Sequence, residues 1–285
     1  MKYLVLGCNG MVGHMVAVYL SERGNDVTGF AHKNSKYVRT IIGDAFNINY
    51  VAKIIEDGEY DAIINCIGIL NRFAENDKKS AVFLNSFLPH FLVDITQKTH
   101  TQVIHISTDC VFSGKRGEYT EHDFRDGETF YDRSKALGEI EDEKNLTLRN
   151  SIIGPDLNPN GIGLLNWFLQ AGEKVNGYVG AIWTGQTTLQ LAKTIEEASK
   201  LRFHGLINAV PNNGISKYEL LKLLNKYFCK NSIIINPVTT YSVNKSLKRT
   251  NFDFNYQIPD YEVMIAELYE WVRVHKDMYP HYKLK

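Results

Sequence analysis

Short apolar runs rich in β-branched residues alternate with amphipathic stretches along the first half of the chain. This alternation is typical of successive strand–helix units that build a parallel sheet. The predicted strands are residues 2–7, 26–31, 60–66, 102–107 and 146–151, with a later one at 205–210. The helical pattern falls at residues 11–23, 47–57, 78–98 and 130–143. We therefore expect an α/β fold with a doubly wound parallel sheet, which binds ligands at the carboxyl ends of its strands.

After Pro155 the alternation gives way to the turn-rich stretch GPDLNPNGIG. A helix predicted at 187–201 then leads into the last strand, so the chain is expected to return to the sheet. Two more amphipathic helices follow at 216–228 and 260–275, separated by irregular, strand-like pieces. The prediction is a sheet domain formed by residues 1–153 and 184–210, and a smaller, discontinuous second domain formed by residues 154–183 and 211–285.

Composition narrows the kinds of partner. The 285 residues include 32 basic and 32 acidic side chains, so no net charge attracts nucleic acid or an anionic membrane. The N-terminal apolar run is too short for a signal peptide and leads straight into glycines. Four cysteines without a CxxC pair fit reduced thiols better than disulfides or a zinc site. We expect a cytoplasmic protein with no nucleic-acid or membrane partner and no metal.

The segment GCNGMVG joins the first predicted strand to the first predicted helix, with its glycines in a GxxGxxG spacing. Glycine permits a tight turn and lets a pyrophosphate approach the amides at a helix N-terminus, where the helix dipole favours negative charge. A purely structural turn is the alternative, but a strand before and an apolar-periodic helix after are the context of dinucleotide binding. The predicted contacts are Gly7, Asn9, Gly10, Met11, Val12 and Gly13.

The end of the second predicted strand indicates which dinucleotide binds. An acidic residue there would bind the ribose hydroxyls of NAD, whereas a basic residue would accept the 2′-phosphate of NADP. The sequence has His32 and Lys33 at this place and no acid before Asp44. We therefore expect NADP(H) to be preferred over NAD(H), and a solvated loop charge is the alternative explanation of Lys33.

A tyrosine and a lysine four residues apart, Tyr131 and Lys135, lie on the helix before the strand 146–151. Residues at this spacing share one helix face. The spacing by itself says little, because it recurs at Tyr218/Lys222, Tyr241/Lys245 and Tyr279/Lys283. Only the first pair lies between two predicted parallel strands, downstream of the glycine turn and of the hydroxyl-bearing strand end HISTD.

With these motifs the chain resembles the extended short-chain dehydrogenase/reductases, whose signature is a GxxGxxG turn, a Ser or Thr, and a YxxxK helix. A closer similarity, to the dTDP-4-dehydrorhamnose reductase group, rests on STDCVFSGKRGEYTE, YDRSKALGE, LRNSIIG and WTGQTTLQLAK, and covers residues 1 to about 200. The resemblance implies a Rossmann-type sheet domain beside a substrate domain. It also implies NADPH-dependent reduction of a keto-6-deoxysugar, the 4-keto group above all, in surface-polysaccharide or deoxysugar biosynthesis.

A ketone accepts a hydride readily only if the growing alkoxide is stabilised and protonated. By the resemblance, Tyr131 donates that proton and Thr108 hydrogen-bonds the carbonyl oxygen. Tyrosine has an unperturbed pKa of about 10. A neighbouring ammonium would lower this pKa, so Lys135 is predicted to shift the pKa of Tyr131. By the resemblance, Lys135 also holds the nicotinamide ribose. Ser107 is the less favoured hydroxyl, because the residue before Asp109 takes this role in the group.

The resemblance implies further, softer contacts with the cofactor. The stretch GDAF resembles the segment that approaches adenine, and NCIG stands where relatives have an alanine-rich strand end. Asn85 is a candidate to position water or backbone near the site, or else a solvent-facing helix residue. The predicted contacts are Asp44 and Ala45 at the adenine, Cys66, Ile67 and Gly68 along the cofactor, Ile106 and Ser107 on the central strand, and Asn150, Ser151 and Ile152 beside the nicotinamide.

The second domain of this group holds the nucleotide of the substrate. Trp183 is a candidate to stack on a base or sugar, or else a tryptophan packed at a domain boundary. Three cations are candidates to pair with a diphosphate, or else form a solvated charge run: Lys245, Lys248 and Arg249. Arg72 is a candidate to reach the sugar. The remaining predicted substrate contacts are Thr108, Asp109, Cys110 and Val111.

Two other functions stay open. Dehydratases of this family place an acidic residue after the catalytic threonine and another beside it, whereas Cys110 follows Asp109 here. That favours reduction, although an epimerase activity, alone or coupled to reduction, stays an alternative function. One relative of the group is a non-catalytic regulatory subunit, so an NADP-binding module is the third hypothesis. The intact set of Thr108, Tyr131 and Lys135 argues against it. The expected partner is a nucleoside-diphosphate keto-sugar, and a homodimer is a candidate assembly.

Overall fold

The computed structural model describes residues 1–284 and is built around a large sheet of eight strands. The strand order is β3-β2-β1-β4-β5-β6-β8, and β9 also pairs with β6. All of these strand pairs are parallel. The strands are β1 Lys2–Leu6, β2 Asp26–Ala31, β3 Thr40–Ile42, β4 Ala62–Asn65, β5 Gln102–Thr108, β6 Leu146–Ile153, β8 Gly185–Thr187 and β9 Gly205–Asn208.

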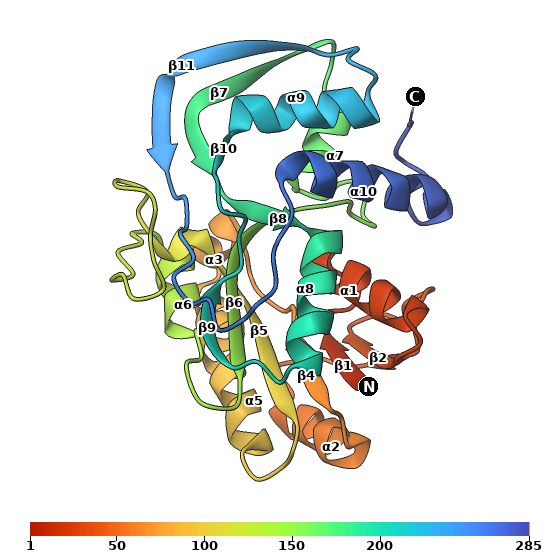
Figure 1. The fold of residues 1–285 in the computed structure, drawn as a ribbon. Coiled ribbons are helices and arrows are strands. Elements are labelled where there is room, and N and C mark those ends of the chain that lie inside the picture. Colours follow the sequence, from red (N-terminus) through yellow and green to blue (C-terminus); the bar gives the residue numbers. More distant parts are fainter. Residues whose placement is uncertain (285) are drawn as a thin grey trace.

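Helices cover both faces of the large sheet and make three layers (Figure 1). Successive residues of β1 point to opposite faces, so Tyr3 and Val5 join the core with α1 and α8, and Leu4 joins the core with α2 and α5. The helices here are α1 Met11–Glu22, α2 Ile48–Gly58, α3 Asn71–Asn76, α4 Lys78–Ala81, α5 Leu88–Thr96, α6 Phe130–Leu137 and α8 Thr188–Lys200. A π-helical turn, η1 Val82–Phe87, joins α4 to α5, and a 3₁₀ turn, η2 Asp109–Val111, follows β5.

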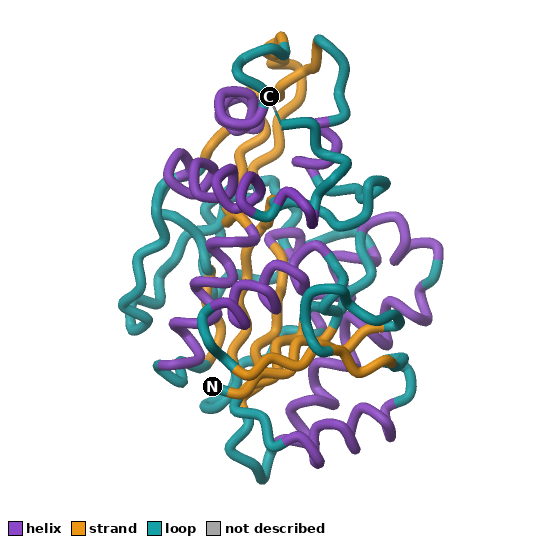
Figure 2. Tube along the Cα trace, turned by 90° about the vertical axis from the view of Figure 1, so that its right-hand side faces the viewer, coloured by secondary structure: helices purple, strands orange, loops and turns teal. Residues whose placement is uncertain are grey.

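A second sheet of three strands lies beyond the carboxyl edge of the large sheet (Figures 1 and 2). Its central strand is β7 Lys174–Trp183, with β10 Ile215–Ser216 antiparallel on one side and β11 Ile234–Asn244 parallel on the other. The helices α9 and α10 connect this sheet to α8 and so extend one hydrophobic core between the two sheets. The remaining elements are α7 Leu164–Leu169, α9 Lys217–Phe228, α10 Tyr261–Val274 and the 3₁₀ turn η3 Lys276–Met278.

Strand β6 has two neighbours on its outer side. Its first half pairs with β9 over Leu146–Arg149, and its second half pairs with β8 over Ser151–Ile153. Only Thr184 separates β8 from the end of β7. The chain therefore passes from the small sheet into the carboxyl edge of the large one with almost no connecting loop.

The predicted α/β fold class is confirmed, and each strand predicted for the large sheet is present. The helix predicted over 130–143 ends at Leu137, with Gly138 as its C-cap, and a β-carbon on Gly138 would lie 1.9 Å from the carbonyl oxygen of Asn85. β11 falls among the strand-like pieces expected between the last two helices, whereas β7 is not predicted, because Gly177 and Gly180 weaken its strand pattern. The division into two discontinuous domains stays a prediction. No helix within residues 1–284 is long and apolar enough to span a membrane.

A buried histidine connects α1 to the C-terminal region. His14 donates from Nδ1 to the carbonyl of Gly10 at 2.9 Å and accepts at Nε2 from the Tyr279 hydroxyl at 2.9 Å. Trp271 in turn donates to that hydroxyl, at 3.4 Å. Burial lowers the pKa of His14 from 6.5 to about 4, so the ring is neutral in the folded protein.

We expect this histidine to make the protein less stable in mild acid. Above pH 6.5 the ring is neutral in both states, but as the pH falls toward 4 the unfolded chain binds a proton that the folded chain excludes. The free energy of unfolding should fall by up to about 3 kcal/mol over this interval. Denaturant unfolding at several pH values measures it, and His14→Gln should give a flatter pH dependence. Parallel curves for the two proteins would contradict the assignment.

Candidate functional site

A cleft runs along the carboxyl edge of the large sheet. It consists of two adjoining cavities of 410 and 360 Å³, which share Gly10, Cys66, Ile67 and Gly68. A doubly wound sheet is expected to bind its ligands at this edge. The predicted cofactor residues that line it are Gly7, Asn9, Gly10, Met11, Val12, His32, Lys33, Asp44, Ala45, Cys66, Ile67, Gly68, Ile106, Ser107, Tyr131, Lys135, Asn150, Ser151 and Ile152.

The glycine turn forms the floor between the two cavities. Gly7 has a φ of +80°, in the left-handed region, which lets the chain turn sharply after β1. A β-carbon on Gly13 would lie 2.1 Å from the carbonyl oxygen of Gly7, so only glycine allows α1 to approach the turn this closely. Gly13 therefore shapes the turn and does not line the cleft.

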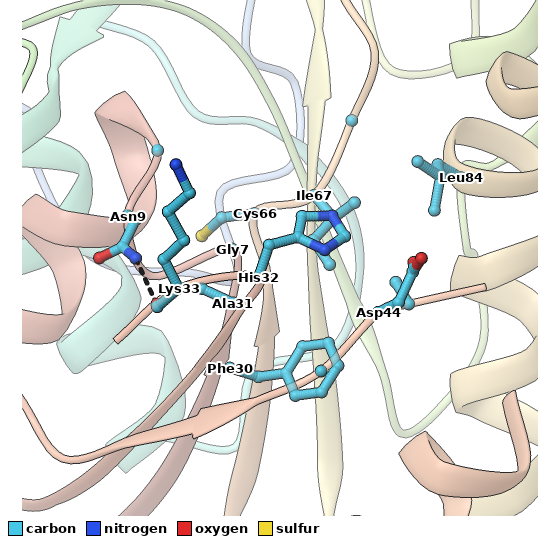
Figure 3. Close-up of a pocket in the computed structure, with 14 residues that line it drawn as sticks. Gly7, Asn9, Phe30, Ala31, His32, Lys33, Asp44, Cys66, Ile67 and Leu84 are labelled. Carbon is cyan, nitrogen blue, oxygen red and sulfur yellow. Dashed lines mark hydrogen bonds between the residues drawn. The ribbon is translucent and has the colours of Figure 1, made fainter. Parts of the chain in front are cut away.

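The N-terminus of α1 opens into the cleft. Its N-cap is Gly10, and among the described residues no side chain caps it and no acid lies in its first turn. Uncapped amides together with the helix dipole suit an anion such as a pyrophosphate. Asn9 donates from Nδ2 to the carbonyl of Lys33 at 2.8 Å and so ties the turn to the loop after β2 (Figure 3).

The 410 Å³ cavity has one ammonium and one carboxylate on its wall. Lys33 and His32 project from the loop after β2, with Asn9 on one side and Asp44 on the other (Figure 3). The Asp44 carboxylate accepts from the amide of Phe46 at 3.0 Å, which fixes it on the loop that follows β3. The Lys33 side chain is exposed and makes no ion pair among the described residues.

The end of β5 separates the roles of its two hydroxyls. Ser107 donates from Oγ to Glu139 at 2.7 Å, and Glu139 also receives both Nε and Nη2 of Arg149, at 2.8 and 2.7 Å. Arg125 donates to the same carboxylate. The Ser107 hydroxyl therefore belongs to a buried ion-pair network, although its residue lines the cleft. The Thr108 hydroxyl, in contrast, takes no part in this network and belongs to a residue that lines the cleft.

Thr108 and Tyr131 meet at the inner end of the 360 Å³ cavity. The Thr108 hydroxyl donates to Oδ1 of Asp109 at 3.1 Å and accepts from the amide of Cys110 at 3.1 Å. Burial raises the pKa of Tyr131 strongly, Cys110 and Asp109 raise it further, and a hydrogen bond with Thr108 acts in the lowering direction. Tyr131 is therefore a neutral phenol in the protein alone, which is the protonation state that an acid needs.

Lys135 lies one turn from Tyr131 and is 5% exposed. Its ammonium nitrogen donates to the carbonyl of Ile106 at 2.8 Å and lies 3.2 Å from Nε2 of His105. Burial lowers the pKa of Lys135 to about 8, against the raising influence of Glu139 and Cys66. The predicted lowering of the tyrosine pKa by Lys135 is thus not what the protein alone shows, because burial dominates the pKa of Tyr131.

Asn150 has an unsatisfied side chain at the cleft. It is 1% exposed, yet neither Nδ2 nor Oδ1 has a hydrogen-bond partner among the described residues. Buried polar groups are nearly always paired. An amide that offers both a donor and an acceptor fits the carboxamide of a nicotinamide, so this end of the cleft suits the cofactor that the glycine turn indicates.

Asn85 acts on the backbone of the cleft wall. Its side chain accepts from the amide of Ile69 at 2.8 Å and donates to the carbonyl of Ile69 at 2.9 Å and to Ser134 Oγ at 3.0 Å. It therefore clamps the segment after β4 to the helix of Tyr131. Asn85 lies in the π-helical turn, a feature that is frequent at functional sites.

The predicted substrate residues fall into two groups. Asp109 and Cys110 line the cleft with Thr108, whereas Val111 is buried beneath them in a separate small core. Arg72 is exposed and lies over the ring of Phe73, although its neighbours Leu70 and Asn71 line the cleft.

The other four come from β7 and from the segment that follows β11. Trp183 is 3% exposed and packs in the core, so it has the packed position that the sequence left open as an alternative. Lys245 is 4.0 Å from Asp132, and Lys248 is exposed. The Arg249 guanidinium donates to the carbonyls of three residues, Asn251, Phe254 and Tyr256, and so holds its own loop.

Lys217 is a cation of the site that the sequence does not reveal. It begins α9, and its ammonium lies 5.0 Å above the ring of Trp183. Burial lowers its pKa to about 8, against the charge of Asp109. Burial raises the pKa of Asp109, and the charges of Lys217 and Lys245 act on it in the lowering direction. The other residues that line the cleft without having been predicted are Phe30, Ala31, Gly43, Leu70, Asn71, Leu84, Asp156, Ile162 and Gly163.

A family model described as the RmlD substrate binding domain matches residues 1–152, more than half of the chain. The chain belongs to this family. The matched part of the RmlD-family chain holds the glycine turn, the Thr108 strand end and the Tyr131 helix. It is 32% identical to a dTDP-4-dehydrorhamnose reductase of Burkholderia thailandensis over 142 residues. These residues make up 49% of this chain and 45% of the relative. The chain spans about half the length of the curated relatives it matches.

Solved structures share the whole fold of this RmlD-family chain. A dTDP-4-dehydrorhamnose reductase from Bacillus anthracis, in complex with NADP, has a TM-score of 0.81 at 20% identity, covering 95% of this chain and 99% of that one. The Bordetella bronchiseptica enzyme WbmH, in complex with NAD+, has a TM-score of 0.76 at 18% identity, covering 95% and 98%. At these identities the likeness concerns the fold alone.

Proposed function

We propose that the chain is an oxidoreductase that uses NADPH to reduce a keto-6-deoxysugar carried on a nucleoside diphosphate, the 4-keto group above all. This reaction would serve the synthesis of surface polysaccharides or other deoxysugar products. The observation that carries the proposal is the meeting of Thr108, Tyr131 and Lys135 at one end of a cleft whose other end is an uncapped helix N-terminus. The reductase named among the relatives supports it.

The proposed roles follow from protonation and position. The bound cofactor would supply the hydride, with its pyrophosphate at the N-terminus of α1 and its carboxamide at Asn150. Thr108 would turn its hydroxyl hydrogen from Asp109 to the sugar carbonyl oxygen, and Tyr131 would give that oxygen its proton. Because burial keeps Tyr131 neutral, the phenol holds this proton until negative charge develops beside it.

The preference for NADPH rests on Lys33, because an ammonium is the complement of a 2′-phosphate. Complexes with NADP and with NAD both occur among proteins of this fold. The two lysines whose charges act on Asp109, Lys217 and Lys245, are proposed to pair with the diphosphate of the substrate. A cytoplasmic location, the absence of a nucleic-acid partner and a homodimer stay predictions.

Replacing the proposed proton donor should separate catalysis from binding. Tyr131→Phe should lower kcat for NADPH oxidation by at least about 100-fold, since a positioned acid contributes 10² or more, while the dissociation constant of NADPH changes little. Steady-state kinetics with a panel of nucleotide keto-sugars, and NADPH fluorescence titration, measure the two quantities.

Tyr241→Phe is the matched control for this change, because Tyr241 has the same spacing to a lysine but is 51% exposed on β11. It should behave as wild type. Equal activity of wild type and Tyr131→Phe would favour the binding-module hypothesis, as would a wild type that oxidises no NADPH with any sugar it binds.

Cofactor choice should depend on Lys33. Lys33→Ala should raise the Michaelis constant for NADPH by about tenfold, which corresponds to the loss of one charge-assisted hydrogen bond. The Michaelis constant for NADH should stay unchanged. Lys36→Ala, an exposed lysine that does not line the cleft, is the control. A wild-type enzyme that prefers NADH would overturn the assignment.

The substrate side can be tested through Lys217. Lys217→Met should raise the Michaelis constant of the nucleotide sugar by about tenfold and reduce the thermal shift given by the best of UDP, dTDP, GDP and CDP. Lys222→Met, on the same helix and paired with Glu219, should leave both unchanged. The assignment fails if both variants bind the nucleotide as wild type does.

A further inference from the structure

The buried side of Lys135 meets a chain of hydrogen-bonding groups that the proposed reaction does not yet use. Nζ of Lys135 is 3.2 Å from Nε2 of His105, and Nδ1 of His105 is 3.2 Å from Nδ2 of Asn65. The amide of Ile67 donates to Oδ1 of Asn65, also at 3.2 Å. Asn65 and His105 are directly opposite each other on β4 and β5, and both are completely buried.

Counting hydrogens along this chain fixes the tautomer of His105. Since Ile67 N–H occupies Oδ1 of Asn65, the Nδ2 group of Asn65 is a donor toward Nδ1 of His105. Nδ1 must then carry a lone pair, and a neutral imidazole with a bare Nδ1 carries its proton on Nε2. The Nε2–H bond therefore points at Lys135.

An N–H donor can bond a neutral amine, which has a lone pair, but not an ammonium, which has none. The neutral Lys135 satisfies all partners at once, because one of its own N–H groups donates to the carbonyl of Ile106. Turning the Asn65 amide round does not help the ammonium, because it sets Nδ2 against the N–H of Ile67. The arrangement is complete only with Lys135 uncharged.

Other charged groups near this chain act in known directions. Burial lowers the pKa of His105 well below 6.5, and the charges of Lys135 and His90 lower it further, so the ring stays neutral. Glu139 and Cys66 act on Lys135 in the opposite sense and favour its ammonium. Tyr131 is the ionisable neighbour on the same helix. The lysine is thus held between groups that favour each of its two forms.

We propose that Asn65 and His105 are positioning residues that stabilise the amine form of Lys135, and so set the pH above which this lysine loses its charge. The inference rests on the proposed reduction. After hydride addition to the carbonyl carbon, the sugar alkoxide takes the phenolic proton of Tyr131. The ammonium of Lys135 favours the phenolate that remains, and the phenolate regains a proton from solvent before the next turnover. When Lys135 loses its charge, the lone pair of its amine accepts Nε2–H of His105.

The tautomer and the titration can be measured without any substrate. Nitrogen NMR of histidine-labelled protein should show His105 with its proton on Nε2, and a proton on Nδ1 would overturn the proposal. Carbon NMR of lysine-labelled protein, with the Lys135 signal assigned by its loss in Lys135→Met, follows the titration of that lysine. In His105→Leu the midpoint of the Lys135 titration should rise by about one pH unit, because the amine form loses one hydrogen bond.

His105→Gln is the conservative variant, because its amide again offers an N–H donor, and its midpoint should stay close to that of wild type. In the reductase assay the alkaline fall of kcat should move with the midpoint in His105→Leu and return in His105→Gln. Unmoved midpoints in His105→Leu would refute the role of the pair, even if the enzyme is active. A shifted midpoint without NADPH oxidation in any protein would instead refute the proposed reaction.

Discussion

The carboxylate of Glu139 fixes the site, because it joins three parts of the chain at one buried point. Arg149 of β6 binds it with two hydrogen bonds, Ser107 of β5 donates to it, and Arg125 reaches it from the preceding loop. Burial alone would raise the pKa of Glu139, but these partners outweigh it and lower the pKa. Removing one member of a buried ion pair typically costs about 3–5 kcal/mol. The network therefore holds the ends of β5 and β6 in register where Thr108 and Asn150 meet the cleft.

The same network divides labour between adjacent residues. The Ser107 hydroxyl donates to Glu139, and the hydroxyl of the next residue, Thr108, forms the hydrogen bond with Tyr131. A comparable division occurs on β4, where Asn65 faces the buried histidine while the following residues form the cleft wall. Ser107 on β5 and Asn65 on β4 thus make buried hydrogen bonds behind the site, and the residues that follow them line the cleft.

Local patterns sufficed for the parts of the fold in which sequence neighbours cooperate. The strand, glycine turn and helix of residues 2–22 follow from periodicity and spacing, whereas the pairing of Tyr131 with Thr108 was implied by the resemblance to the reductase group. Lys217 could not be predicted in the same way, because its meeting with Asp109 joins segments more than a hundred residues apart. Trp183 was open to two interpretations, a side chain that stacks on a base or sugar and a packed one, and it is buried in the core. The strand β7 was not predicted because Gly177 and Gly180 weaken its strand pattern, although four of its ten residues are buried.

The junction of β7 and β8 has a mechanical consequence. With Thr184 alone between them, and with its hydroxyl accepting from the amide of Leu247, the two strands form one extended strut from the outer sheet into the edge of the large sheet. A junction without a connecting loop transmits displacement directly, so a movement of β7 would also move β8 and the end of β6 with which β8 pairs.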